Sequence, residues 1–263
     1  MESASLLAMA LLVIASALLL FGAVGKGAFH RTWAGMRRNW PWLILLVAAT
    51  AIERGSGRLT PDHPYLLKMS PPGEILAGVP VWLQSVIPSL FGTSFFGTIY
   101  IAAFLVCLIV LPLYLLAAGE DTIFRRYCLS ISLAYLLLIV LHLAILSVRP
   151  GLDPASGIAG LLYFNPFWGP FSQDLISRGN SLPSGHVISL TASAVAIWPL
   201  KRPRTEVLVL LSLTVVAVLY LGIHWPVDVI AGLLLGAASG LAAIKIIEKW
   251  ERKKFRRSRP GSP

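Results

Sequence analysis

The chain has 263 residues, of which 56% are hydrophobic and only 13% are charged, and its formal net charge is +10 at pH 7. About a quarter of the residues in a typical soluble domain are charged, so this composition excludes an ordinary soluble enzyme and indicates a helical membrane protein. The Lys and Arg residues lie in short segments beside apolar stretches, which favours contact with anionic lipid over binding of nucleic acid.

Seven apolar stretches predict seven transmembrane helices. Five of them come close to the roughly 20 residues that cross a bilayer: 5–24, 98–119, 129–148, 205–223 and 229–247. Two shorter stretches, 39–53 and 184–200, reach that length only if their polar flanks sink into the interface. The first stretch has no basic segment before it and no obvious cleavage site after it, so we expect an uncleaved anchor rather than a signal peptide.

A further apolar segment, residues 75–91, lies between the second and third stretches and contains Pro80 and Pro88. Proline removes a backbone donor and disrupts the interior of a helix. We therefore expect this segment to lie along the membrane interface and not to cross the bilayer.

The distribution of Lys and Arg predicts the orientation of the chain. All but five of the 22 Lys and Arg residues fall between spans one and two, three and four, or five and six, or from Lys245, near the end of span seven, onward. Basic residues accumulate on the cytoplasmic side, so these segments and the C-terminus should be cytoplasmic and the N-terminus outside. The five on the outer side are Arg54, Arg58, Lys68, Arg149 and Arg178.

Two polar motifs stand at the expected outer edge of apolar stretches. Pro183-Ser184-Gly185-His186 is typical of a helix start, where unpaired backbone N–H groups suit a bound phosphate. His224 and Asp228 lie one helical turn apart, so the carboxylate can hold one ring nitrogen and leave the other free to react. Such groups are costly beside a membrane core unless they have a function. The second motif therefore predicts an activated histidine nucleophile.

These motifs are similar to the second and third signatures of the type 2 phosphatidic acid phosphatase (PAP2) superfamily, membrane phosphatases that cleave lipid phosphates and diphosphates. The first signature of that family is a Lys, six residues, then Arg-Pro; here Arg149-Pro150 matches, but His142 occupies the position of the Lys. The third signature opens with Ser-Arg, and Ala217-Val218 stands there instead. The resemblance covers residues 130–235 in fragments.

The resemblance implies an all-α integral membrane protein with a six-helix PAP2-like transmembrane core and one additional N-terminal transmembrane helix. Residues 1–38 would form that anchor and a basic cytoplasmic loop, residues 39–248 the helical membrane domain, and residues 249–263 a basic cytoplasmic tail. The active site would then face the periplasmic or extracytoplasmic side.

The resemblance also implies a role for each motif residue. His224, oriented by Asp228, would attack phosphorus, and His186 would act as general acid and then as general base. The non-bridging phosphate oxygens would be held by a guanidinium and by backbone N–H groups. The residues expected to do so are Arg149, Ser184 and Gly185.

The departures from the family signatures leave the site with fewer fixed positive charges. Arg178, in the loop before the second motif, is a candidate replacement for the Arg that Val218 lacks. His142 lies two turns before Arg149 on the same helix face. It can either contribute weakly to phosphate binding or be a buried neutral histidine bonded to a neighbouring helix.

The cysteines and histidines do not predict a metal site. Cys107 lies inside a predicted span and Cys128 at a cytoplasmic helix end, and no Cys/His spacing resembles a zinc site. We expect no cofactor and no metal. The expected partners are a lipid phosphate substrate and membrane lipids, with no nucleic acid.

The sequence thus predicts a membrane lipid phosphatase that works at the outer face through a phosphohistidine. A lipid phosphotransferase would use the same histidine with a lipid hydroxyl in place of water. A non-catalytic lipid-binding relative is a further alternative, because the Lys and the Arg of the family are missing. An ion transporter is a third, although it predicts charges near the middle of the membrane, whereas the charges of this chain gather at one face.

Overall fold

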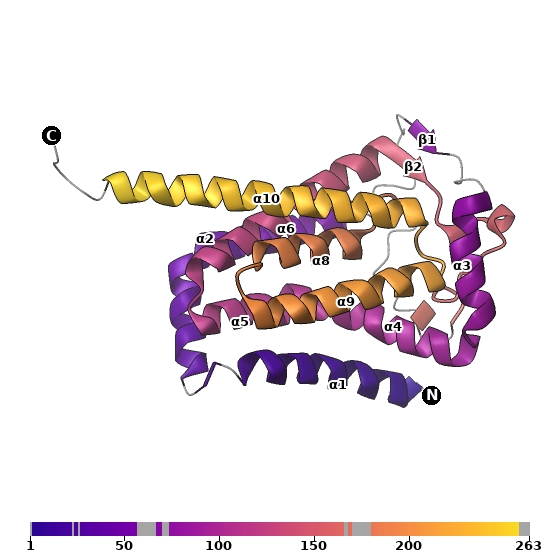
Figure 1. Cartoon of the computed structure of the whole chain (residues 1–263), viewed down its shortest axis with the longest axis horizontal. Coiled ribbons are helices and arrows are strands. Elements are labelled where there is room, and N and C mark those ends of the chain that lie inside the picture. Colours follow the sequence, from indigo (N-terminus) through magenta and orange to yellow (C-terminus); the bar gives the residue numbers. More distant parts are fainter. Residues whose placement is uncertain are drawn as a thin grey trace.

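The structure is a computed structural model of the whole chain, and it describes residues 2–22, 24–25, 27–56, 67–69, 74–165, 168–169 and 180–257. Most of these residues form helices that lie side by side in one elongated bundle (Figure 1). The helices along the bundle are α1 (Glu2–Phe21), α2 (Ala28–Ser56), α4 (Ser89–Leu105), α5 (Leu111–Ala118), α6 (Asp121–Ala144), α8 (Gly185–Ala196), α9 (Lys201–Tyr220) and α10 (Pro226–Arg257). A π-helical turn, Val106–Val110, joins α4 to α5.

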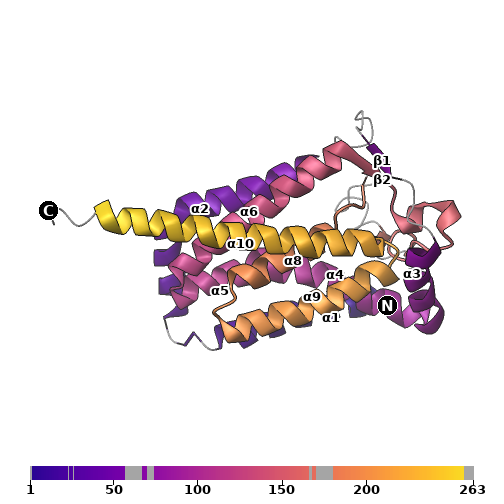
Figure 2. The same cartoon turned by 45° about the horizontal axis from the view of Figure 1, so that its top comes forward.

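Short elements cover one end of this bundle. Helix α3 (Glu74–Val86) lies across that end, roughly perpendicular to the long helices, in both Figure 1 and Figure 2. Strand β1 (Leu67–Met69) pairs in parallel with β2 (Ile145–Ser147), and two 3₁₀ turns follow at Pro150–Leu152 and Pro154–Ser156. An interfacial position for the segment 75–91 stays a prediction, and its last residue, Phe91, begins a helical segment long enough to cross a membrane.

The predicted apolar stretches lie mostly on helices, and the count of six spans plus one stays a prediction. The stretch 129–148 is an exception, because α6 ends at Ala144 and the chain continues as the extended strand β2. The expectation that His142 and Arg149 share one helix face was therefore wrong, since Arg149 lies beyond β2. Among the described residues, four helical segments are long and apolar enough to cross a membrane: Phe91–Ala118, Asp121–Ala144, Lys201–Tyr220 and Pro226–Arg256. Met9–Phe21 and Gly185–Ala196 are shorter apolar helices. These segments make the chain a multi-pass membrane protein.

Two prolines explain how the predicted boundaries relate to the observed ones. Helix α2 bends at Asn39, whose backbone is non-helical, because Pro41 cannot complete the helical hydrogen-bond ladder. The apolar stretch 39–53 is therefore the straight part of α2 after the bend. In the segment 75–91, Pro88 separates α3 from α4 as expected, whereas Pro80 is accommodated inside α3.

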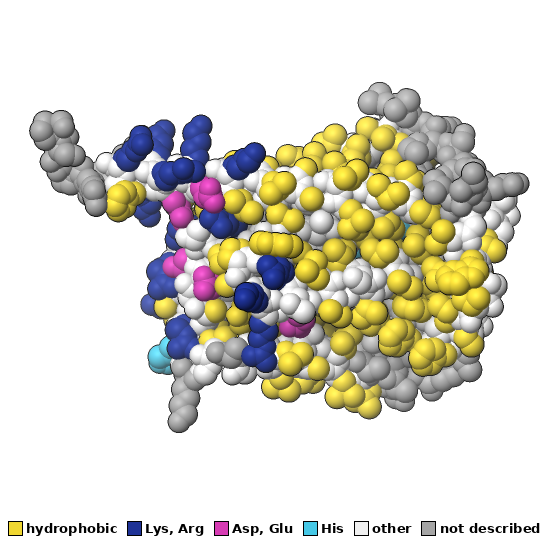
Figure 3. All heavy atoms as spheres, viewed as in Figure 1, with side chains coloured by type: hydrophobic (Ala, Val, Ile, Leu, Met, Phe, Trp, Pro, Cys, Tyr) yellow, Lys and Arg dark blue, Asp and Glu magenta, His cyan; other side chains and the backbone are white. Residues whose placement is uncertain are grey.

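The Lys and Arg side chains gather at the end of the bundle opposite α3, and hydrophobic side chains cover most of the remaining face (Figure 3). The chain reverses direction between successive helices, so the starts of α2, α6 and α9 and the end of α10 meet there. Ion pairs connect these helices: Arg38–Asp121 at 2.9 Å, Arg125–Glu251 at 3.2 Å and Arg126–Glu248 at 3.0 Å. We call this end the cationic end.

Glycines on one face of α10 allow it to approach α8 closely. A Cβ atom at Gly236 would lie 2.5 Å from the carbonyl oxygen of Ile188, and one at Gly240 would lie 2.6 Å from Cβ of Val195. Small residues spaced one turn apart let two helix backbones pack in direct contact. This packing brings the first turn of α10, with Asp228, beside the start of α8, where the Ser184 N–H donates to the Asp228 carbonyl at 3.1 Å.

Candidate active site

The predicted motifs converge at the end of the bundle opposite the cationic end, where the chain leaves α6, enters α8 and turns from α9 into α10 (Figure 1). A cavity of about 50 Å³ opens between them. It has room for only a few water molecules or one small tetrahedral anion. The predicted site residues in its wall are His142, Arg149, Gly185, His186 and His224.

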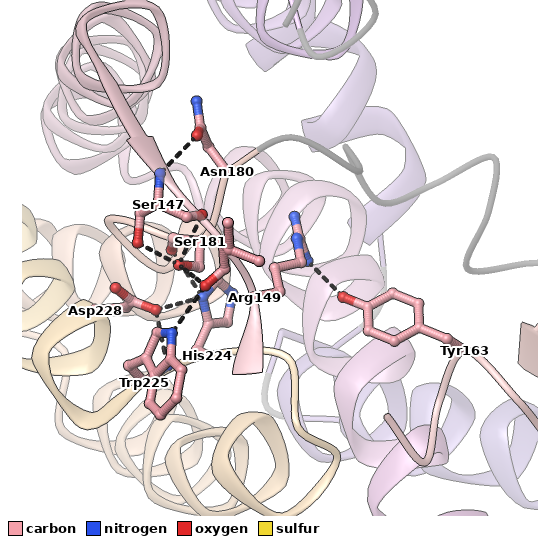
Figure 4. Close-up of polar contacts among 9 residues, drawn as sticks. Ser147, Arg149, Tyr163, Asn180, Ser181, His224, Trp225 and Asp228 are labelled. Carbon is pink, nitrogen blue, oxygen red and sulfur yellow. Dashed lines mark hydrogen bonds and ion pairs between the residues drawn. The ribbon is translucent and has the colours of Figure 1, made fainter. Parts of the chain in front are cut away.

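The ring of His224 is held by one nitrogen. Its Nδ1 lies 2.8 Å from the backbone oxygen of Ser181 and 3.5 Å from Oδ2 of Asp228 (Figure 4). A carbonyl oxygen can only accept, so Nδ1 carries the proton and Nε2 keeps its lone pair. The side chain is buried and lines the cavity. A neutral imidazole with one fixed and one reactive nitrogen is what a histidine nucleophile requires.

Asp228 serves both the ring and the backbone. The side chain is completely buried, and Oδ2 also accepts the N–H of Trp225 at 2.8 Å. The indole Nε1 of Trp225 donates in turn to the carbonyl of Val148 at 2.8 Å (Figure 4). These bonds fix the start of α10 against the segment that carries Arg149.

The position of His224 also determines its protonation. It lies between α9 and α10, and burial lowers the pKa of its imidazole below the ordinary value, opposed in part by the hydrogen bond and charge of Asp228. A lowered pKa keeps the imidazole neutral further into the acidic range. The neutral form of the His224 imidazole is therefore favoured at neutral pH.

His186 lies in the first turn of α8 and is held by aromatic rings of α4. Its ring stacks on Tyr100, with centroids 3.8 Å apart and an interplanar angle of 23°, and lies 5.2 Å from the ring of Phe104. Both aromatic side chains line the cavity as well. The His186 imidazole is thus positioned by packing on α4, and it enters the cavity from α8, whereas His224 enters from the connection between α9 and α10.

Arg149 follows β2 and is almost completely buried, with 4% of its surface exposed. Its Nη1 donates to the hydroxyl of Tyr163 at 3.0 Å (Figure 4), while its Nε has no hydrogen-bond partner among the described residues. The next residues are tied to the α9–α10 connection by the Gly151 N–H, which donates to the Gly222 carbonyl at 2.8 Å. A buried guanidinium with donors to spare is suited to an anion.

The family model described as "PAP2 superfamily" matches residues 123–252, which contain all three motifs. The chain belongs to the PAP2 superfamily. A crystal structure of LpxE from Aquifex aeolicus aligns with a TM-score of 0.52 at 18% identity, over 66% of this chain and 96% of that one, which shows a shared PAP2 fold. An undecaprenyl-diphosphatase of Sulfolobus acidocaldarius is 34% identical over 68 residues, 25% of this chain and 33% of that protein. The match thus spans about a third of that relative.

The two departures from the PAP2 signatures lie in different surroundings. His142, in place of the family Lys, is in the cavity wall, and its Nε2 is buried with no hydrogen-bond partner among the described residues. Val218, in place of the family Arg, is fully buried in α9 and is not among the residues that line the cavity. Its carbonyl accepts the N–H groups of Ile223 and His224, so it shapes the turn.

Of the second signature, Gly185 lines the cavity, whereas Ser184 does not. Helix α8 begins at Gly185, and Gly185 lines the cavity, as a phosphate-binding helix start requires. The N–H of Ser184 instead donates to Asp228, and its buried Oγ has no partner among the described residues. We expected the Ser184 N–H to bind phosphate. It donates to the Asp228 carbonyl instead, because α10 packs close to the start of α8. Arg178 lies outside the described residues.

Sequence reasoning missed the residues that other helices bring to the cavity. They are Glu53 and Arg54 at the end of α2, Tyr100 and Phe104 on α4, and Tyr135 on α6. The sequence offered one signal for Glu53 and Arg54. This charged pair ends the second apolar stretch on the predicted outer side of the membrane, the same side as Arg149. Nothing in the sequence marks Ser181, which acts through its backbone carbonyl. Among the described residues, no group of three or more His, Cys, Asp or Glu could hold a metal ion.

Proposed function

We propose that this protein is a membrane phosphatase that hydrolyses the phosphate or diphosphate headgroup of a lipid through a phosphohistidine on His224. The observation that carries the proposal is the fixed tautomer of His224, whose Nδ1 faces Ser181 and Asp228 so that Nε2 is the reactive nitrogen of a cavity wall. Arg149 and His186 line the same cavity. Nucleophile, proton donor and cation are thus within one phosphate-sized space.

The first chemical step forms the phosphoenzyme. The guanidinium of Arg149 and the N–H groups at the start of α8 hold the non-bridging oxygens. Nε2 of His224 attacks phosphorus, the bond from phosphorus to the lipid oxygen breaks, and protonated His186 gives its proton to that oxygen. The lipid leaves as an alcohol, or as a monophosphate if it entered as a diphosphate.

The second step restores the enzyme. Neutral His186 takes a proton from a water molecule, whose oxygen attacks phosphorus as the bond to Nε2 of His224 breaks. Inorganic phosphate leaves, and His186 is again protonated for the next cycle. Asp228 and the Ser181 carbonyl hold Nδ1–H throughout and stabilise the positive ring that forms when Nε2 is substituted.

An apolar groove favours a lipid over a soluble phosphate ester. It lies between α2 and α6, has a volume of about 300 Å³, and shares Tyr135 with the cavity. Its wall includes Leu45, Ile52, Leu133 and Ile139. The cavity admits little more than the phosphoryl group, so the chain of the substrate would lie in such a groove. The relative named undecaprenyl-diphosphatase adds prenyl diphosphates to the candidate substrates.

We further propose that the active site faces the extracytoplasmic side and that the C-terminus is cytoplasmic. The support is the cationic end, which lies opposite the cavity along the bundle (Figures 1 and 3). Clustered Lys and Arg favour the cytoplasmic side of a membrane. The basic residues of the segment 249–257, which forms the end of α10, would then meet anionic lipid at that surface.

Phosphate release by the detergent-solubilised protein tests the function. The panel would contain phosphatidic acid, phosphatidylglycerophosphate, a prenyl diphosphate and lipid A. We expect release from at least one of them and an acid-labile phosphoenzyme, trapped by rapid quenching at alkaline pH, that His224→Ala cannot form. A phosphorylated second lipid in place of free phosphate would identify a phosphotransferase, and no turnover of any panel member would favour a non-catalytic relative.

A further inference from the structure

The cavity holds a cation that the family signatures do not predict. A PAP2 site has a Lys and a second Arg that are replaced here by His142 and Val218. The described cavity wall nevertheless contains two guanidinium groups, on Arg149 and on Arg54. Arg54 belongs to α2, outside the residues 123–252 that match the family.

We propose that Arg54 binds the substrate phosphate and replaces the positive charge that the PAP2 signatures normally supply. This inference rests on the proposed phosphatase function and adds a residue to it. A phosphoryl group carries close to two negative charges near neutral pH, and further negative charge must be stabilised as its bonds rearrange. Arg149 alone would leave much of that charge without a fixed partner in the cavity.

Neighbouring side chains hold the Arg54 guanidinium at the cavity. Its Cζ lies 4.5 Å from the centroid of the Phe104 ring, and the same ring lies 5.2 Å from the imidazole of His186. The guanidinium and the proposed proton donor are therefore packed on one aromatic side chain. The attraction between a guanidinium and an aromatic face fixes the position of the charge. This places Arg54 on the side of the cavity where the lipid oxygen would leave.

Arg54 forms an ion pair with Glu53 in the wall of the cavity. Nε of Arg54 lies 3.7 Å from Oε2 of Glu53, and the Arg54 side chain is 34% exposed. The planar fork of a guanidinium matches the oxygen atoms of a phosphate as well as those of a carboxylate. Glu53 balances the charge of Arg54, and a bound phosphate would compete with Glu53 for the guanidinium. Glu53 also lines the cavity, so the pair enters the site together.

Substitutions of Arg54 test this role against a purely structural one. We expect Arg54→Ala to lower kcat/KM on the best lipid substrate by at least about 100-fold. Arg54→Lys should lie between Ala and wild type, because an ammonium keeps the charge but loses the planar fork. Arg37→Ala is the matched control, since Arg37 is on the same helix but at the cationic end, packed on Trp33. Its activity should equal that of wild type.

A measurement that needs no turnover separates this inference from the proposed function. Inorganic phosphate should raise the Tm of the wild-type protein and of Arg37→Ala, and it should raise that of Arg54→Ala much less. The Tm without phosphate should be similar in all three. If no lipid of the panel is hydrolysed but the phosphate shift depends on Arg54, the proposed function fails and the anion site stands. Full activity and a full phosphate shift in Arg54→Ala would overturn the inference alone.

Restoring the charge in two other ways completes the test. Guanidinium ion added to Arg54→Ala should recover part of the lost activity, and it should have no such effect on wild type. His142→Lys places the family cation in the same cavity wall, so adding it to Arg54→Ala should raise activity at least about tenfold. If neither treatment helps and Arg54→Ala also lowers the Tm without phosphate, the residue is structural and the inference is wrong.

Discussion

The charged side chains at the two ends of the bundle differ in how deeply they are buried and in the partners they have. At the cationic end, arginines are paired with carboxylates across α2, α6 and α10, and Arg38 keeps 54% of its side chain accessible, whereas Arg125 and Arg126 keep about a sixth. At the cavity end, Arg149, His224 and Asp228 are nearly or completely buried, and their partners include a tyrosine hydroxyl and backbone groups. A buried charge costs far more than an exposed one.

That difference agrees with the proposed roles, in which the charges of the cationic end orient the chain and those of the cavity act on a substrate. Exposed ion pairs contribute little individually, so the cationic end works through its total charge. Each polar group at the cavity is expensive to keep and holds one defined position. Substitutions should therefore be tolerated at the cationic end and costly at the cavity.

The largest expected difference between the two ends is the side of the membrane that each faces. Labelling of an introduced cysteine from outside the cell should be complete at one end and absent at the other. In intact cells, Ala155→Cys should react with an impermeant thiol reagent, whereas Lys253→Cys should react only after the membrane is opened. Both positions are exposed, and the native Cys107 and Cys128 are buried, so the unmodified protein is the blank. Labelling of position 253 alone would place the cavity on the cytoplasmic side.

The largest effect on activity should come from the two histidines. His224→Ala removes the proposed nucleophile and His186→Ala the proposed proton donor, and we expect each to lower kcat by at least about 10³-fold. The Tm should change little. Arg38→Ala, which breaks an exposed ion pair at the cationic end, is the control and should keep wild-type turnover. Turnover near the wild-type rate in either histidine variant would refute its assigned role.

Local sequence patterns predicted much of this contrast. The apolar stretches are helical over most of their length, the cations of alternate loops meet at one end, and three separated motifs reach one cavity. Membrane-spanning segments must satisfy their own backbone hydrogen bonds, so length and hydropathy suffice to find helices. The bend at Pro41 also accounts for the short second stretch.

The parts that sequence reasoning missed depend on contacts between distant segments. Arg54 and Phe104 reach the cavity because α2 packs on α6 and α4 packs on α8. The sequence placed Arg54 on the outer side but did not place either residue at the site. Ser181 orients His224 through its carbonyl, a group that every residue has. The amide of Ser184 was expected to face phosphate, but the glycine face of α10 lets Asp228 approach and accept it.

Asp228→Asn should have an intermediate effect, because the Ser181 carbonyl still holds Nδ1–H of His224 at 2.8 Å. We expect about a 100-fold loss, smaller than the roughly 10⁴-fold loss where a carboxylate alone fixes the tautomer. Asp228 raises the pKa of His224 against the lowering effect of burial. Its neutralisation should therefore move the acidic limb of the kcat/KM profile to lower pH. A limb that moves to higher pH would contradict this electrostatic role.

Tyr163→Phe should have the smallest effect, because it removes one hydrogen bond and no reacting group. The hydroxyl of Tyr163 accepts Nη1 of Arg149 at 3.0 Å, and Tyr163 is not itself in the cavity wall. Losing such a bond costs about 1 kcal/mol, so kcat/KM should fall about fivefold to tenfold, against at least about 100-fold for Arg149→Ala.

The matched control is Tyr114→Phe, which removes the same hydroxyl from α5, where the ring packs on Phe21 of α1. The control should keep its activity and its inhibition by inorganic phosphate, whereas Tyr163→Phe should need more phosphate for half inhibition at an unchanged Tm. A Tyr163→Phe enzyme with wild-type phosphate inhibition would mean that burial alone positions Arg149. The bonds around each buried charge at the cavity would then matter less than the packing that encloses them.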